Sequence, residues 1–270
     1  MQKLPLSLVV ITKNEELNIE RCVASVPFAS EVVILDSFST DRTQELAEKM
    51  GAKFYQEAWR GYGPQKRHAT TLASYDWVLN LDADEALSPK LQDEIFENFV
   101  NLDPQKAYEF SRYSFHLGRW IRFGGWHPDW QLRLFHRSYH QWPDTQIHER
   151  VESQNKVRMK HAILHWVFKD LSHQVVTNDK YSSLQAVDLF KKAKAFSLYY
   201  LLVKPPTKFI ELYFFKRGFL DGMAGFVIAV SAAYSVFLKW AKLWELSRVK
   251  PIFSDQAKRW PQSEQRSKHD

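Results

Sequence analysis

The stretch of sequence that decides the fold is WVLNLDADE, residues 77–85. A mostly apolar run ends here in three carboxylates, which is typical of a buried strand that enters a polar loop. Two carboxylates one residue apart, Asp82 and Asp84, can hold a hard divalent cation against a diphosphate. The same spacing is common in solvated turns, so its meaning depends on the segments around it.

Further strand signals precede this stretch, at residues 6–11, 32–35 and 53–56. Helical patterns separate them, with an expected capping box at Asp41 and Gln44. Repeated strand–helix units predict an α/β fold, in which helices cover both faces of a twisted and mostly parallel sheet.

Polar clusters follow three of these strands, at residues 12–16, 36–41 and 82–85. Ligands of such sheets bind outside the carboxyl ends of the strands, so the clusters predict a binding site at this edge. Lys66 falls on a helix expected to approach the same edge, where it meets a phosphate or simply faces solvent. The chain has no GxGxxG after the first strand and no GxxxxGK[ST], which disfavours dinucleotide-binding and P-loop proteins.

Residues 106–168 have a different pattern. Strands are expected at 107–112 and 131–137, and the Gly, Arg and Trp residues between them suit a cleft wall. On this side, Glu149 is a candidate general base, with a salt bridge to Arg150 as the alternative. His127, His148 and His165 are candidate metal ligands or hydrogen-bonded structural residues.

Composition and charge narrow the class of protein. Hydrophobic residues make up 45% and charged residues 25% of the chain, which excludes a disordered or fibrous protein. Residues 1–150 carry a net charge of −4 and residues 151–270 a net charge of +10, so the second part suits an anionic surface. Cys22 is the single cysteine, so no internal disulfide forms, and no secretory signal is visible.

The C-terminal part is apolar and basic. Lys204-Pro205-Pro206 predicts a hinge or helix boundary, and residues 222–238 form a 17-residue stretch without charge. That length is the lower edge of what can span a bilayer, so a membrane-embedded or interfacial hairpin and a buried helix both stay open.

Several motifs together resemble the family 2 inverting glycosyltransferases. The resemblance covers about residues 4–246, and the N-terminal motifs are VVITKNEE (9–16), LDSFSTD (35–41) and LDADE (81–85). Later motifs are similar to lipopolysaccharide core-biosynthesis β-1,4-glucosyltransferases: GRWIR (118–122), GGW (124–126), QLRLF (131–135), IHERV (147–151) and KRGFLDG (216–222).

The resemblance implies a GT-A fold, a UDP-sugar donor and an Mg²⁺ or Mn²⁺ ion. By motif, Asp36 would meet uracil or ribose, Asp82 the ribose side and Asp84 the metal. The other implied donor-site residues are Thr12, Asn14 and Glu16 at the nucleotide and Lys66 at the phosphates.

Two positions depart from the family pattern. His148-Glu149 stands where an acid pair Glu-Asp is usual, so Glu149 is the favoured base and Asp129 the runner-up. Phe38 stands where glycine is more usual, which should narrow the backbone options of that turn.

The sequence therefore predicts a cytoplasmic enzyme at the inner membrane. It would move glucose from a UDP-sugar to a lipopolysaccharide core or related glycolipid, and would bind an anionic membrane surface but no nucleic acid. Transfer to polyprenyl phosphate, a nucleotidyltransferase and a glycan-binding protein remain alternatives. The expected parts are a catalytic domain at 1–168, divided into a nucleotide-binding half (1–100) and an acceptor half (101–168), a helical membrane-associated region at 169–250 and a disordered tail at 251–270.

Overall fold

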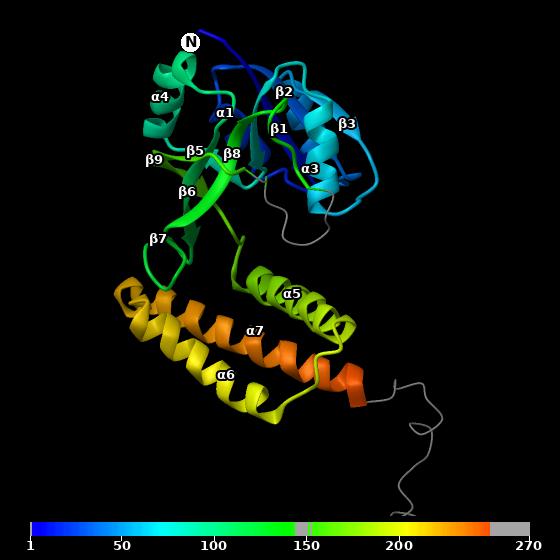
Figure 1. Cartoon of the computed structure of the whole chain (residues 1–270), viewed down its shortest axis with the longest axis vertical. Helices are drawn as coiled ribbons and strands as arrows, with labels where there is room; N and C mark the ends of the chain where they lie inside the picture. Colours follow the sequence, from blue (N-terminus) through cyan, green and yellow to red (C-terminus); the bar gives the residue numbers. More distant parts are fainter. Residues whose placement is uncertain (1, 144–150, 152, 249–270) are drawn as a thin grey trace, which may run out of the picture. The chain divides into compact units, whose positions relative to one another are not determined.

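The structure, a computed structural model, describes residues 2–143, 151 and 153–248 of the chain. Residues 1–167 and 168–270 form two compact units, which we call the sheet unit and the helical unit. Figure 1 shows strands and helices together in the first, and helices in the second. The expected disordered tail, residues 251–270, lies outside the described part.

The first part of the sheet confirms the predicted strand–helix repeats. Its four strands are parallel and lie in the order β3-β2-β1-β4. The strands are β1 (Leu4–Thr12), β2 (Ala29–Asp36), β3 (Lys53–Gln56) and β4 (Trp77–Asp82), and the helices between them are α1 (Ile19–Ala24), α2 (Thr43–Lys49) and α3 (Tyr62–Thr71).

The sheet becomes mixed beyond β4. Its order continues β4-β8-β6-β9-β5, with β7 paired to β6, and only the β6–β9 pair is parallel among these. The elements are β5 (Glu85–Leu87), α4 (Pro89–Asn98), a 3₁₀ turn (Phe99–Asn101), β6 (Ala107–His116), β7 (Arg119–Ile121), β8 (Asp129–His136) and β9 (Lys156–His165). Strands β6 and β8 match the two expected there, whereas β5, β7 and β9 were not predicted.

Two apolar cores cover the two faces of the sheet. One contains Ile19 of α1, Leu46 of α2 and Leu91 of α4, and the other contains Ala69 of α3 with Phe135 of β8. Helices therefore lie on both faces, as the sequence pattern predicted. This packing leaves the carboxyl ends of the parallel strands free to carry polar groups.

The parallel register brings the predicted polar clusters to one edge. Thr12 lies opposite Asp36, and Ile11 opposite Asp82. The expected capping box is wrong in detail, since Gln44 donates its amide to Glu48 at 2.8 Å. Asp41 instead accepts from the backbone N–H groups of Thr43 at 3.0 Å and Glu16 at 3.1 Å, so it joins two loops at this edge.

The helical unit contains α5 (Leu171–Lys191), α6 (Leu198–Ile210) and α7 (Gly222–Arg248). A π-helical turn (Glu211–Phe215) and a 3₁₀ turn (Gly218–Asp221) connect α6 to α7. Helix α7 packs against both other helices and lies between them (Figure 1). Ala186, Trp240 and Leu243 form the small core of this unit.

The expected boundary at Lys204-Pro205-Pro206 is wrong, because both prolines lie inside α6. Proline lacks the N–H that would reach the fourth preceding carbonyl, so it weakens a helix interior. Helix α6 continues through these positions while packed along α7. Long-range packing has therefore overridden the local signal.

Candidate active site

Asp36 ends β2 and is fully buried. Its Oδ1 accepts from the hydroxyl groups of Thr12 at 2.8 Å and Ser39 at 2.5 Å, and its Oδ2 accepts from the backbone N–H of Ser39 at 2.7 Å. A carboxylate offers about four acceptor positions, so one remains for an imide or hydroxyl donor. Neutral donors thus fix Asp36 in place without consuming its whole capacity.

Asn14 and Glu16 hold together the loops that follow β1 and β2. The side-chain oxygen of Asn14 accepts from the backbone N–H of Thr40 at 2.8 Å, and Glu16 Oε2 accepts from that of Arg42 at 3.2 Å. Both side chains therefore shape the edge around Asp36. Their predicted contact with a nucleotide remains a prediction.

Phe38 lies in the loop that follows β2. Its φ is 59°, and 53% of its surface is exposed. This left-handed conformation is one that glycine adopts at little cost and that a bulky residue rarely adopts. Lys13 donates its ammonium group to the carbonyl of Ser37 at 2.8 Å and so braces the turn. The positive φ explains why glycine would suit this position, and Phe38 adopts the same conformation with its ring exposed.

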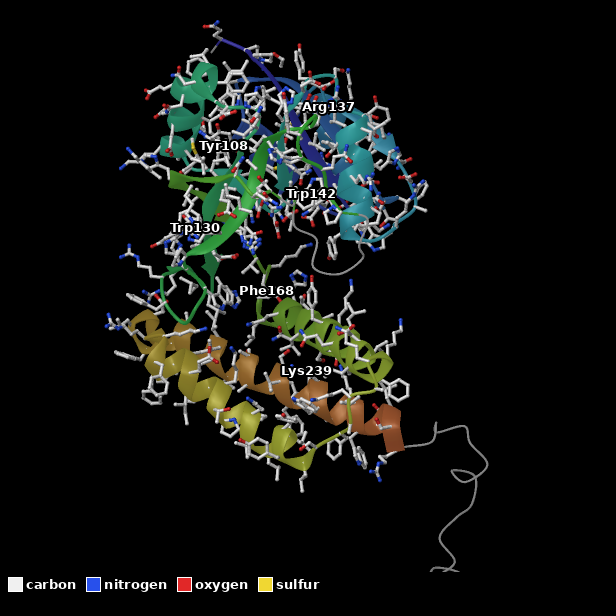
Figure 2. The ribbon with its side chains drawn as sticks, in the orientation of Figure 1. Tyr108, Trp130, Arg137, Trp142, Phe168 and Lys239 are labelled. Atoms are coloured by element: carbon white, nitrogen blue, oxygen red, sulfur yellow. The ribbon has the colours of Figure 1, made fainter. Side chains whose placement is uncertain are left out.

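Asp82 is held by two cations. Lys66 Nζ lies 2.7 Å from its Oδ1, and Arg133 donates to its Oδ2. Burial opposes the charged carboxylate, but Arg133 and Lys66 outweigh burial and hold the pKa of Asp82 far below its usual range. Lys66 also lies 4.8 Å from the centre of the Trp142 ring, which Figure 2 labels. The lysine that the resemblance assigns to the phosphates is therefore paired with Asp82.

Arg133 and Arg112 extend the ion pairs across the sheet. Glu85 is fully buried, and its Oε1 accepts from Arg133 at 2.7 Å and from Arg112 at 3.2 Å. Burial disfavours both guanidinium charges, but their carboxylate partners raise the pKa of Arg133 and of Arg112. No individual role for Glu85, Arg112 or Arg133 was predicted from the sequence. An arginine between leucines in Gln131–Phe135 was the available signal.

Asp84 has a different neighbour. Its Oδ2 lies 3.3 Å from His165 Nε2, and the hydroxyl of Ser114 lies 3.1 Å from His165 Nδ1. His165 is the only ion-pair partner that the described part of the chain offers to Asp84. Of the three candidate histidines, His165 thus lies beside the predicted metal ligand, while His127 Nδ1 contacts the carbonyl of Arg112 at 3.2 Å.

Few side chains near Asp84 could act as ligands of a metal cation. Among the described residues, no three His, Cys, Asp or Glu side chains form a group that could hold a metal ion. Asp84 Oδ2 and His165 Nε2 fit a cation that takes its remaining ligands from water or a substrate phosphate, since carboxylate oxygen suits Mg²⁺ and Mn²⁺. Asp82 suits a cation less well, because Lys66 and Arg133 already neutralise its charge.

Of the two candidate bases, the structure describes Asp129 but not Glu149. Asp129 Oδ2 accepts from Arg112 Nη2 at 2.6 Å and Nε at 2.9 Å, and its Oδ1 accepts from Gln131 at 2.8 Å. Glu149 and His148 lie outside the described residues. Asp129 is therefore a carboxylate with both oxygens engaged.

Trp166 is joined to Asp84 through its backbone, and its ring packs against Arg21 and Trp120. The backbone N–H of Trp166 donates to the carbonyl of Asp84 at 2.9 Å, and the Arg21 guanidinium lies 3.6 Å from the centre of the Trp166 ring. Trp120 meets Trp166 edge-on at 5.4 Å. Flat rings of this kind can stack against the apolar face of a sugar.

A protein-family model described as glycosyl transferase family 2 matches residues 7–162, which contain most of the sheet and its carboxylates. The chain belongs to glycosyltransferase family 2. The matched segment carries Asp36, Asp82 and Asp84 together with both halves of the sheet. The fold is of the GT-A type, and the nucleotidyltransferase and glycan-binding alternatives are set aside.

Similar proteins extend this match over most of the chain. An uncharacterized glycosyltransferase of Rickettsia bellii is 35% identical over 257 residues, which cover 90% of this chain and 87% of that protein. The lipopolysaccharide core biosynthesis glycosyltransferase LpsC of Rhizobium meliloti is 30% identical over 256 residues, covering 92% and 95%.

A weaker likeness is found among solved structures. Glucosyl-3-phosphoglycerate synthase from Mycobacterium tuberculosis, in complex with Mn²⁺, UDP and glucosyl-3-phosphoglycerate, is 22% identical with a TM-score of 0.34. The match covers 41% of this chain and 44% of that one.

Proposed function

We propose that this glycosyltransferase moves a hexose, glucose, from a UDP-sugar to a lipopolysaccharide core or related glycolipid, with inversion and with Mg²⁺ or Mn²⁺. Family membership supports sugar transfer, and the relative LpsC supports the acceptor class. Transfer to polyprenyl phosphate is the alternative within the same reaction class.

The contrast between Asp82 and Asp84 carries the proposal. Cations of the chain neutralise Asp82, whereas Asp84 faces a histidine that can be uncharged. A neutral His165 with its proton on Nδ1 would donate to Ser114 and offer Nε2 beside Asp84 Oδ2. Asp84 and His165 would then hold the cation, which as a Lewis acid would stabilise the charge of the leaving diphosphate.

The donor would lie along the edge formed by the strand ends. Asp36 keeps an acceptor position for the uracil imide or a ribose hydroxyl, and Thr12 and Asn14 shape the surrounding loops. Glu16 would complete the nucleotide pocket from the same loop. Lys66 would stabilise the phosphates with its positive charge. It is paired with Asp82, which is proposed to lie on the ribose side of the donor.

The acceptor hydroxyl requires a base on the other side of the donor. Glu149 is proposed for this role and Asp129 is the second candidate. A proton taken up by Asp129 would weaken its pair with Arg112, which favours Glu149. A single displacement with one base would invert the configuration without a covalent intermediate.

The helical unit is proposed to bind an anionic membrane surface at the cytoplasmic face of the inner membrane. Gly218–Arg248 is the one segment of the described chain that is long and apolar enough to cross a membrane. A lipid-linked acceptor would give such an attachment a purpose.

A panel of nucleotide sugars tests the proposal. We expect the purified chain to release UDP from UDP-glucose in the presence of Mn²⁺, to stop when the metal is chelated, and to transfer the sugar to a core glycolipid in preference to polyprenyl phosphate. Release of GDP from GDP-sugars or of ADP from ADP-sugars at the same rate would contradict the proposed donor. Transfer to polyprenyl phosphate alone would contradict the proposed acceptor.

A further inference from the structure

An apolar stripe runs along one side of α7. Met223, Phe226, Val230, Tyr234 and Phe237 follow one another at intervals of three or four residues, and each exposes at least 40% of its surface. Residues at these intervals share one face of a helix. A continuous exposed apolar surface on a folded protein marks a binding surface.

Aromatic rings enlarge this surface at the turn between α6 and α7. Phe226 lies 5.8 Å from Phe209 and 5.7 Å from Tyr213, between ring centres, and Tyr213 lies 6.3 Å from Phe219. Phe215, in the same turn, exposes 82% of its surface. Such exposed rings are typical of segments that enter the interface between lipid headgroups and acyl chains.

The turn itself is rigidly built. A Cβ atom on Gly225 would lie 1.8 Å from the carbonyl oxygen of Gly218, so the first turn of α7 approaches the connection without a side chain between them. Asp221 is fully buried there. The exposed rings are therefore held by a defined hairpin.

A cluster of lysines lies where α6 and α7 run side by side. Burial, followed by the nearby charges of Lys208 and Lys204, lowers the pKa of Lys239, which Figure 2 labels. Lys208 pairs with Glu211 at 3.0 Å. Within the described residues Lys204 and Lys239 have no ion pair, so this cluster carries excess positive charge on the same hairpin that presents the apolar stripe. That combination is complementary to an anionic lipid headgroup.

The direction of α6 argues against a span. Tyr200 stacks on Trp240 at 4.6 Å and Phe209 meets Phe226, so α6 runs antiparallel to α7 along the same stretch. If α7 crossed the bilayer, Lys204, which lies between these two contacts along α6, would lie in hydrocarbon, at a cost of a few kcal/mol. Gly218–Arg248 is long enough to cross, but its uncharged part, residues 222–238, measures about 25 Å, short of the roughly 30 Å of a hydrocarbon core.

We propose that the α6–α7 hairpin lies in the plane of the membrane interface, with its aromatic stripe among the acyl chains and with Lys204, Lys208 and Lys239 bound to the phosphates of anionic phospholipids. This inference rests on the membrane association proposed above and specifies its geometry and its lipid.

Flotation with vesicles of phosphatidylcholine, with and without phosphatidylglycerol, tests the lysine site. The double substitution K204Q/K239Q should weaken binding of the full chain to the anionic vesicles by about 30-fold and leave the weak binding to neutral vesicles unchanged. The control K49Q/K90Q removes the same charge from exposed positions of the sheet unit and should bind as the parent does. Equal binding by both double variants would overturn the lysine site.

Cysteine labelling in inside-out membrane vesicles tests the geometry. In a C22S background, K216C and L246C are placed at the two ends of the α7 segment, and a membrane-impermeant maleimide is added. Each cysteine should be labelled to the same extent before and after detergent is added. A cysteine that reacts only after detergent would show that α7 crosses the bilayer and would overturn the in-plane geometry.

The outcomes separate this inference from the proposed function. If the chain bound no vesicle and sedimented as a stable dimer, the apolar face would be a contact between two copies. Membrane association would then be refuted altogether. Binding without lysine dependence, or a crossing helix, would remove only the in-plane site. UDP release by K204Q/K239Q without acceptor should match the parent in every case, because these lysines lie outside the sheet unit.

Discussion

The two halves of the sheet hold their carboxylates in different ways. At the edge of the parallel half, hydroxyl and backbone groups of Thr12 and Ser39 fix Asp36. In the mixed half, arginines fix Glu85 and Asp129. Asp82 stands at the border and is bound from both sides, by Lys66 and by Arg133. Hydroxyl and backbone groups of the loops thus build the edge of the parallel half, whereas ion pairs of arginine and lysine side chains join the mixed strands to it.

Removal of Arg133 should produce the largest effect on this junction. Arg133→Met leaves buried Glu85 and partly buried Asp82 short of a cation, so we expect a loss of about 3–5 kcal/mol in the free energy of unfolding. Urea unfolding of the full chain measures it. The control Arg42→Met breaks an exposed ion pair with Glu45 and should cause no measurable change. A similar small effect of both substitutions would contradict the role of the junction.

The mixed half should also contain the base. Glu149→Gln is expected to lower sugar transfer by about 10²-fold or more while the affinity for the UDP-sugar stays the same. Transfer and donor binding are measured side by side for Glu149→Gln and Asp129→Asn. Normal transfer by the first and loss by the second would exchange the roles, and full activity of both would refute this placement of the acceptor.

A smaller effect is expected from Glu31, at the opposite end of the parallel half. Burial opposes its charge, but hydrogen bonds from Lys53, Ser7 and Ser74 lower the pKa of Glu31 to about 2. A lowered pKa stabilises the fold above the unfolded value of about 4.3, and this contribution is lost as the pH falls toward the folded value.

Glu31→Gln should therefore cost about 2 kcal/mol at pH 7. The difference from the parent chain should shrink progressively between about pH 4.3 and pH 2. Urea titrations at several pH values measure both quantities. A difference that does not change with pH would assign the effect to packing and not to charge.

The sequence predicted the parallel half well for a physical reason. Its strands are continuous apolar runs that end in polar clusters, and parallel pairing brings those ends to one edge. Strands β5 and β7 have only three residues each, too few for a periodic signal. Strand β9 was missed although Val157 and Met159 alternate with charged residues, a pattern that identifies a half-buried strand.

The resemblance predicted different roles for Asp82 and Asp84. The structure shows that the two carboxylates have different partners, and their roles stay predictions. The pairing of Lys66 with Asp82 and the network through Arg112 and Arg133 could not be read from spacing, because these residues are far apart in the sequence. Pro205 and Pro206 show the same limit for a helix whose packing overrides its local signal.

The most direct test of the proposed metal-dependent transfer compares Asp84→Asn with Asp82→Asn in chelator-treated enzyme to which Mg²⁺ or Mn²⁺ is restored. An amide gives the cation no charge, so Asp84→Asn should keep the fold and lose transfer by about 10³-fold or more. Asp82→Asn should lower transfer and also weaken the binding of the UDP-sugar, because Lys66 and Arg133 lose their charged partner. Near-normal turnover of Asp84→Asn after restoration of the metal would contradict the assignment.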